Sequence, residues 1–159
     1  MKYSKGYQTP STTEDETIYN EFVQRLGEWV CLHDEHIHFK GWPADKPLIK
    51  LCSQTLRVRA NQAWKKLPLD EQECMVAHEL GHREYQHYLS GGLATRTVQL
   101  LSGLPPADEI QADQYAARVV GKTRYLSFLK KKRDATPRDM NYALQLADYN
   151  HRIKALERS

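Results

Sequence analysis

The segment His78–His82, which reads H-E-L-G-H, constrains the fold of this chain more than any other part of its sequence. The residues around it favour a helix, which we expect over residues 70–89. Asp70 and Glu73 form a cap signature at the start of this helix, and a Ser-Gly-Gly sequence follows its end. Because residues four apart on a helix are turned by only about 40° from one another, the two histidines project from one face.

Two imidazoles one helical turn apart suit a tetrahedral zinc ion. Glu79 is offset by about 100° from His78, which places its carboxylate beside the metal and not on it. From there Glu79 can act as the catalytic base that takes a proton from zinc-bound water. Apolar neighbours at Val76, Ala77 and Leu80 indicate a packed helix, which argues against a surface helix with two unrelated histidines. The sequence therefore predicts a metal site with both histidines as ligands.

A catalytic zinc ion needs a third protein ligand and an open fourth position. His87 would be turned by about 140° from His82 on a continuous helix, so we expect it to be exposed. The metzincin pattern, which supplies a third histidine, is excluded because tyrosines occupy both its glycine and its last histidine position. The remaining candidate is Glu109, which shares one face of a helix predicted over 107–120 with Asp113.

Three alanines keep this second helix slim, so it can lie close against the motif helix. Glu109 could then ligate the metal, while Asp113 could hydrogen-bond the far nitrogen of a ligand histidine and fix its tautomer. Asp108 and Glu109 also lie in a first helical turn, where carboxylates are favoured without any metal. We prefer ligation by Glu109, because catalytic zinc sites with two histidines usually finish with a carboxylate.

These motifs resemble those of the gluzincin metallopeptidases, and most of all the prenyl-protein-protease and heat-shock-protease family. The likeness covers about residues 48–156 and rests on H-E-L-G-H at 78–82, E-x-x-A-D at 109–113, L-x-x-L at 126–129 and R-I-x-x-L at 152–156. It implies that Glu109 is the third ligand and that Asp113 orients a histidine, namely His78. The membrane spans of the larger relatives are missing, so their membrane-embedded substrates are not expected here.

The tetrahedral oxyanion formed during peptide hydrolysis needs a further donor beside the metal. Five residues are chemically able to supply it: His151, Arg152, Tyr115, Tyr125 and Tyr142. The terminal pattern of the family favours His151 or Arg152. For each tyrosine, packing as a half-buried aromatic is the simpler explanation.

We expect an α+β, zincin-like fold: a flexible arm over residues 1–12, then a single domain over 13–159. A small antiparallel sheet should hold strands over 48–51 and 55–59, and a mostly helical C-terminal half should carry the site. The other predicted helices span residues 14–32, 94–101, 107–120, 123–132 and a last segment that starts at Thr136 and Pro137. The strand over 55–59 is the expected edge for extended substrate, and its Arg57 and Arg59 either favour acidic substrates or guard that edge.

The composition is typical of a globular domain, since 40% of the 159 residues are hydrophobic and 27% are charged. A net charge of +3 does not indicate nucleic-acid binding, and the basic run 130–133 ends a predicted helix, where cations are favoured anyway. Three scattered cysteines are too few for a disulfide framework. Without a signal peptide or an apolar stretch of about 20 residues, we expect a soluble, cytoplasmic protein.

The sequence therefore predicts a zinc-dependent endopeptidase that uses Zn²⁺ as its cofactor and a protein or peptide as its substrate. One alternative is a regulatory zincin-like module that cuts or binds a single protein partner. Another is a non-enzymatic domain stabilised by zinc. Glu79 argues against the latter, because a structural site needs no base and normally closes its fourth position with protein.

Overall fold

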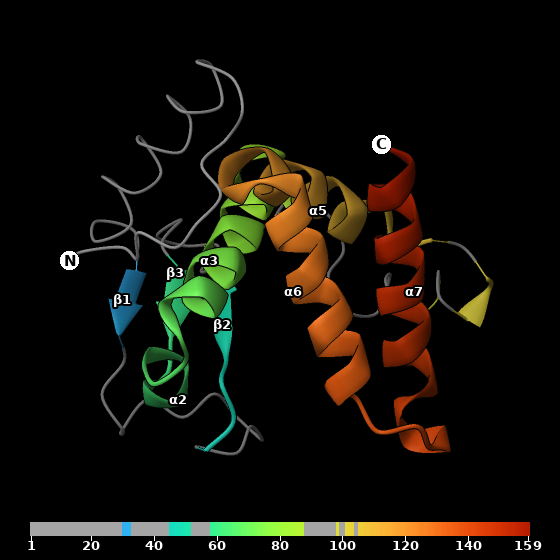
Figure 1. Ribbon diagram of the computed structural model, residues 1–159, viewed down its shortest axis with the longest axis horizontal. Helices are drawn as coiled ribbons and strands as arrows, with labels where there is room; N and C mark the ends of the chain where they lie inside the picture. The colour runs from blue at the N-terminus through green and yellow to red at the C-terminus, as the bar shows by residue number, and fades with distance from the viewer. Residues whose placement is uncertain (1–29, 33–44, 52–57, 88–97, 99–100, 104) are drawn as a thin grey trace.

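The computed structural model describes residues 30–32, 45–51, 58–87, 98, 101–103 and 105–159 (Figure 1). Within these residues, three short strands precede a succession of helices. The strands are β1 (Val30–Leu32), β2 (Ile49–Leu51) and β3 (Val58–Ala60). The helices are α2 (Gln62–Lys65), α3 (Leu69–Glu84), α5 (Ala107–Val120), α6 (Lys122–Ala135), the 3-10 turn η2 (Met140–Tyr142) and α7 (Ala143–Arg158).

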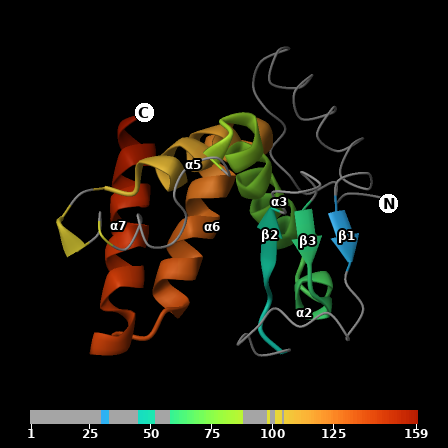
Figure 2. The same cartoon turned by 180° about the vertical axis from the view of Figure 1, so that it is seen from behind.

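The strands of the described sheet lie in the order β1-β3-β2 (Figure 2). Strands β2 and β3 run antiparallel, which confirms the antiparallel pair expected from the sequence. β1 pairs parallel to β3, although the sequence predicts the end of a helix there; that prediction is wrong. A short apolar run fits either a helix or a buried strand, and here pairing with a distant segment decides. Because β3 is the middle strand, Arg59 does not lie on the sheet edge predicted for it.

Helix α5 has the bounds that the sequence predicts, and α6 extends the predicted helix by a few residues. The last helix begins at Ala143, not at Thr136 and Pro137. The Thr136 hydroxyl instead donates to the Lys132 carbonyl and closes α6. Asp139 caps the following 3-10 turn through the backbone N–H of Asn141. The arm expected over residues 1–12, most of the helix expected over 14–32 and most of the helix expected over 94–101 lie outside the described residues.

Helix α3, which carries the H-E-L-G-H segment, starts at Leu69 after Pro68 and has no side-chain cap. The predicted capping role of Glu73 is wrong, because its buried carboxylate accepts a hydrogen bond from Arg124 Nη2 at 2.8 Å. The helix also ends at Glu84, earlier than the sequence predicts. This early end changes the surroundings of the site, as described below.

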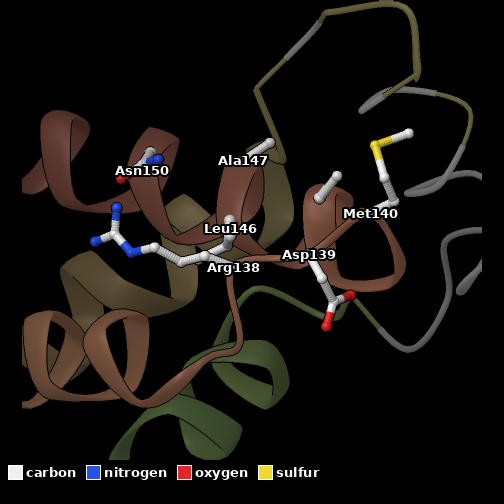
Figure 3. A pocket seen from close by; sticks show the side chains of 7 residues that line it. Arg138, Asp139, Met140, Leu146, Ala147 and Asn150 are labelled. Atoms are coloured by element: carbon white, nitrogen blue, oxygen red, sulfur yellow. The ribbon is translucent and has the colours of Figure 1, made fainter.

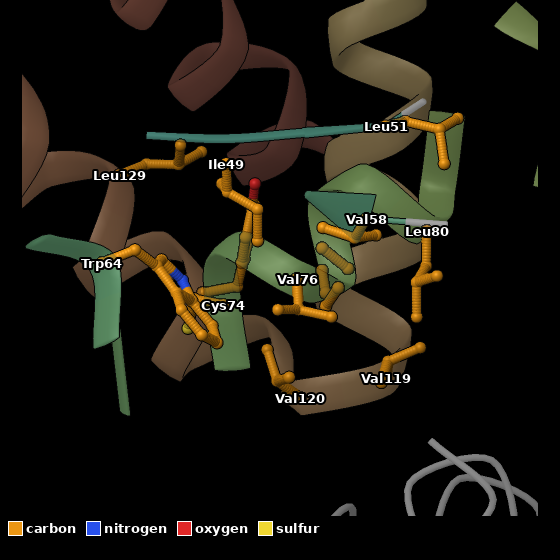
Figure 4. Packing of buried hydrophobic residues seen from close by; sticks show 14 of the residues in the cluster. Ile49, Leu51, Val58, Trp64, Cys74, Val76, Leu80, Val119, Val120 and Leu129 are labelled. Atoms are coloured by element: carbon orange, nitrogen blue, oxygen red, sulfur yellow. The ribbon is translucent and has the colours of Figure 1, made fainter. Parts of the chain in front are cut away.

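The core lies between the sheet and α3 on one side and between α3 and α5 on the other (Figures 1 and 4). Apolar residues of β2 and β3 face Val76 and Leu80 of α3, and Val119 and Val120 of α5 complete the layer (Figure 4). Helices α6 and α7 pack against each other and against α5. In the described part of the chain, none of the helices combines the length and apolarity that crossing a membrane requires. Helix α3 is thus held from both sides.

Candidate metal centre

Helix α3 presents His78 and His82 from one face, as the four-residue spacing predicts. Their Nε2 atoms lie 3.0 Å apart. His78, Glu79 and His82 form a group that could hold a metal ion, since one ligand atom of each lies within 4.8 Å of the others. The helix thus brings the two imidazoles and the carboxylate of the motif together.

Glu109 approaches the same two nitrogens from α5. One of its carboxylate oxygens lies 2.9 Å from Nε2 of His78, and the other lies 3.3 Å from Nε2 of His82. In a tetrahedral zinc site with bonds of about 2.0 to 2.1 Å, neighbouring ligand atoms are about 3.3 Å apart. The observed separations approach this value, so two imidazoles and one carboxylate fit zinc in both chemistry and spacing.

Helices α3 and α5 meet where Gly81 faces the backbone of Ala112. A Cβ atom at Gly81 would lie 2.7 Å from the carbonyl oxygen of Ala112 and 2.8 Å from its Cα. Ala112 and Ala116 are fully buried, which confirms that small residues let the two helices approach. Sequence reasoning identified the alanines of α5 in this contact but missed Gly81 on α3. Its backbone approach sets the distance from the histidines to Glu109.

Replacing Gly81 by alanine should therefore damage both the fold and the site. The added methyl meets backbone atoms that cannot turn away, so the two helices must separate. We expect this to lower the free energy of unfolding by about 1 to 3 kcal/mol. We expect zinc affinity to fall by at least about tenfold, because metal sites tolerate only small shifts of their ligands. Chemical denaturation and zinc titration measure the two effects. Glu84→Ala, at the exposed end of the same helix, is the control, and equal zinc affinity in both variants would contradict the prediction.

Asp113, one turn beyond Glu109 on α5, lies behind His78. The Nδ1–H of His78 donates to Asp113 Oδ1 at 2.8 Å, and the hydroxyl of Tyr125 donates to the same oxygen at 2.6 Å. A carboxylate only accepts hydrogen bonds, so the proton of a neutral His78 is on Nδ1 and its Nε2 lone pair faces Glu109. Asp113 is thus placed where the sequence predicts an orienting acid.

Arg152 is held on the far side of Asp113. Its Nε and Nη2 atoms donate to the two oxygens of Asp113 at 2.7 and 2.8 Å, and Nη1 donates to Asp148 Oδ2 at 3.1 Å. Nη1 also lies 3.7 Å from Glu109 Oε2. The guanidinium is therefore held by carboxylates, and Arg152 also lines the cavity described below. The spacing of Asp148 and Arg152, four apart on α7, is the signal that sequence reasoning overlooked.

The other proposed oxyanion donors are dispersed. His151 is half-buried on α7 and is not among the residues that line the cavity described below. Tyr125 is buried and donates to Asp113, while Tyr115 packs against the core. Tyr142 does line the cavity. Tyr125 lines the same cavity, but its hydroxyl is engaged by Asp113. Among the described hydrogen bonds, Tyr142 makes none to Asp113.

The charges around the two helices favour a cation at the centre. Burial alone would lower the pKa of His78, but the charge of Glu109 and the hydrogen bond to Asp113 raise it to about 10. Burial would raise the pKa of Glu109, but the attraction of His78 holds it well below its usual range. Arg152 likewise outweighs burial and lowers the pKa of Asp113. The negative potential that stabilises a proton on His78 would equally stabilise a metal ion.

Glu79 faces a cavity beside the sheet. The backbone N–H of Leu51, on the edge strand β2, donates to Glu79 Oε2 at 2.9 Å. The cavity has a volume of about 810 Å³, and β2, α3, α6, η2 and α7 contribute to its walls. His78 also lines this cavity, whereas His82 and Glu109 are not among its lining residues. Glu79 thus contacts the edge strand and lies beside the two histidines of the motif.

His87 is not exposed, contrary to the expectation for a continuous helix. Because α3 ends at Glu84 and Gln86 adopts a φ of 55°, the chain turns back over the site. The side chain of His87 is 9% exposed, and its Nδ1 lies 2.8 Å from Nδ1 of His82. Sequence reasoning missed this contact because it extended the helix too far.

A second hollow of about 580 Å³ lies at the start of α7 (Figure 3). Its lining includes Arg138, Asp139 and the exposed Met140 (Figure 3). None of the residues that the sequence singles out lines it, so we assign it no role in the site.

Taken together, the described residues define a mostly helical protein with a candidate metal-binding group on α3. Of the residues singled out from sequence, Glu109, Asp113 and Arg152 converge on this group, and His151 does not line its cavity. No known family model, curated protein sequence or solved structure matches the chain.

Proposed function

We propose that this protein is a zinc-dependent endopeptidase with His78, His82 and Glu109 as its metal ligands. The observation that carries the proposal is the convergence of two Nε2 atoms and one carboxylate within 3.3 Å, beside a cavity that Glu79 faces. Two imidazoles and a carboxylate that leave a fourth position open are the donor set of catalytic zinc sites. A purely structural zinc site would close that position with protein.

Glu79 serves as the general base in this proposal. When bound, zinc lowers the pKa of a coordinated water to about 7 and polarises the substrate carbonyl. Glu79 accepts a proton from the attacking water and passes it to the leaving amine. The N–H of Leu51 holds Oε2 of Glu79, which leaves Oε1 to face the water. Asp113 and Arg152 keep the His78 ring in place during this exchange.

The substrate lies along β2 in this proposal. The sequence assigned the substrate-binding edge to residues 55–59, but β3 is the middle strand and β2 is an edge of the described sheet. An extended peptide beside β2 would gain main-chain hydrogen bonds with little demand on sequence. Lys46 and Lys132 line the cavity, and among its described lining residues Glu79 is the sole carboxylate. This charge favours neutral or acidic peptides over basic ones.

Zinc analysis combined with a cleavage assay tests the proposal. We expect the purified protein to hold about one zinc per chain and to cleave an unfolded protein substrate, because the donor set is that of a catalytic site. A strong chelator should stop cleavage, and stoichiometric zinc should restore it. Glu109→Ala should lose its zinc to micromolar chelator that the wild type withstands.

Full zinc retention by Glu109→Ala would show that Glu109 is not a ligand. Tight zinc binding without cleavage of any unfolded substrate would overturn the endopeptidase proposal. That result would favour the regulatory module that acts on one protein partner, or the zinc-stabilised domain. If the purified protein neither binds zinc nor needs it for cleavage, the proposed metal site itself is refuted.

A further inference from the structure

The two ligand histidines are held from behind by different partners. Nδ1 of His78 faces a buried, charged carboxylate, Asp113. Nδ1 of His82 faces Nδ1 of His87 at 2.8 Å, and Nε2 of His87 in turn lies 2.7 Å from Oε1 of Gln111. We propose that His87 and Gln111 are positioning residues, a hydrogen-bonded pair that fixes the tautomer and orientation of His82 for the metal. The inference rests on the zinc site proposed above.

The direction of each hydrogen bond follows from the atoms at the outer end of the pair. An amide oxygen only accepts, so Nε2 of His87 carries a hydrogen and donates it to Gln111. A carboxylate oxygen of Asp108, 3.7 Å from the same nitrogen, also favours a hydrogen there. In the His87 tautomer that carries its one hydrogen on Nε2, the bare Nδ1 accepts a hydrogen bond from Nδ1–H of His82.

The proton on Nδ1 of His82 leaves its Nε2 with a lone pair. That Nε2 is the atom 3.0 Å from Nε2 of His78 and 3.3 Å from the carboxylate of Glu109. Both imidazoles thus present a lone pair to one point, each because a different residue holds the hydrogen of its other nitrogen. Mutation of a residue that orients a ligand histidine in this way typically lowers metal affinity by about 10- to 100-fold.

The backbone supports the same inference. Of the residues that the structure describes, Gln86 is the one non-glycine residue with a positive φ, at 55°. This conformation is disfavoured for a residue with a side chain and tends to occur at functional sites. Its effect is to end α3 early and bring His87 over His82, where the ring also stacks on Tyr85 at 5.9 Å between centroids. A helix continued past Glu84 would turn position 87 away from His82.

The test measures zinc affinity in four variants of the full chain by competition with a chromogenic chelator. We expect His87→Ala to weaken zinc binding by about 10- to 100-fold. His87→Gln, whose amide oxygen can still accept from His82, should recover part of that loss. Gln111→Ala should weaken binding by a smaller factor, because it leaves His87 in place but frees its tautomer. Gln114→Ala, an exposed glutamine on the same helix, is the matched control and should bind as the wild type does.

Unfolding of the metal-free proteins separates positioning from general packing. If the pair positions His82, its mutation lowers zinc affinity in a protein that is still folded. The stability of metal-free Gln111→Ala should then equal that of the wild type, because the Gln111 side chain is exposed. Zinc affinities of His87→Ala and Gln111→Ala within about twofold of the control would overturn the inference while leaving the metal site intact. A wild type that binds no zinc would refute the proposed site and this inference with it. If His87→Ala does not fold, Gln111→Ala decides.

Discussion

Glu79→Gln should abolish peptide cleavage while leaving zinc bound. Glutamine has nearly the shape of glutamate, and its amide oxygen can still accept the hydrogen bond from the N–H of Leu51. It cannot take a proton from the attacking water, however, and general base catalysis is worth about 10²- to 10⁴-fold in rate. The rate of hydrolysis of an unfolded substrate, measured together with the zinc content of the same sample, checks both halves of the prediction.

Glu84→Gln is the matched control, because Glu84 is an exposed glutamate on the same helix. It should keep wild-type activity. Retained cleavage in Glu79→Gln would refute the role of Glu79 as a base. Loss of zinc from this variant would instead make Glu79 a ligand, which the group of His78, Glu79 and His82 would allow by distance. The two measurements therefore distinguish a base from a ligand.

The parts of the site that depend on one helix could be predicted from the sequence. His78 and His82 share a face because helical spacing alone requires it. The bounds of α5 follow from Pro106, which precedes its first turn, and Gly121, which ends it. Small residues on α5 correctly indicated a close approach to α3, and this approach brings Glu109 to both imidazoles. In each case the signal lies within a few residues along the chain.

The parts that depend on distant segments could not be predicted. Strand β1 forms because its backbone pairs with β3, and a short apolar run such as Val30–Leu32 fits either a strand or a helix. The position of His87 depends on where α3 ends, and helix ends are poorly determined by periodicity. The family's terminal pattern favoured Arg152 as an oxyanion donor, and its sequence neighbourhood could not reveal that Asp113 lies against it. Long-range contacts decide β1 and the position of Arg152, and the local end of α3 decides the position of His87.

The contact between Arg152 and Asp113 leads to the second large effect. Arg152→Leu should lower the free energy of unfolding by about 3 to 5 kcal/mol, since it removes the guanidinium that donates to two buried carboxylates, Asp113 and Asp148. Urea denaturation at pH 7 measures the loss. Arg158→Leu, at the exposed end of the same helix, should change stability by less than about 0.5 kcal/mol.

The pH dependence of this loss identifies its cause. Arg152 holds the pKa of Asp113 below its unfolded value of about 4, although burial alone would raise it. A depressed pKa stabilises the folded state above the unfolded pKa, and that stabilisation decreases as the pH falls toward the folded one. In Arg152→Leu the pKa of Asp113 is lowered less. The difference in unfolding free energy between wild type and variant should therefore be largest above about pH 5 and should decrease below about pH 4.

A difference that stays constant from pH 7 to pH 3 would mean that Arg152 acts through packing and not through its charge. If the predicted narrowing is found, the buried guanidinium is what allows Asp113 to remain ionised behind His78. The same ion pair then explains why the terminal helix is needed by a metal centre that takes none of its proposed ligands from it. In the proposed metal site, helix α7 fixes the charge of Asp113, Asp113 fixes the tautomer of His78, and His78 would present its lone pair to the ion.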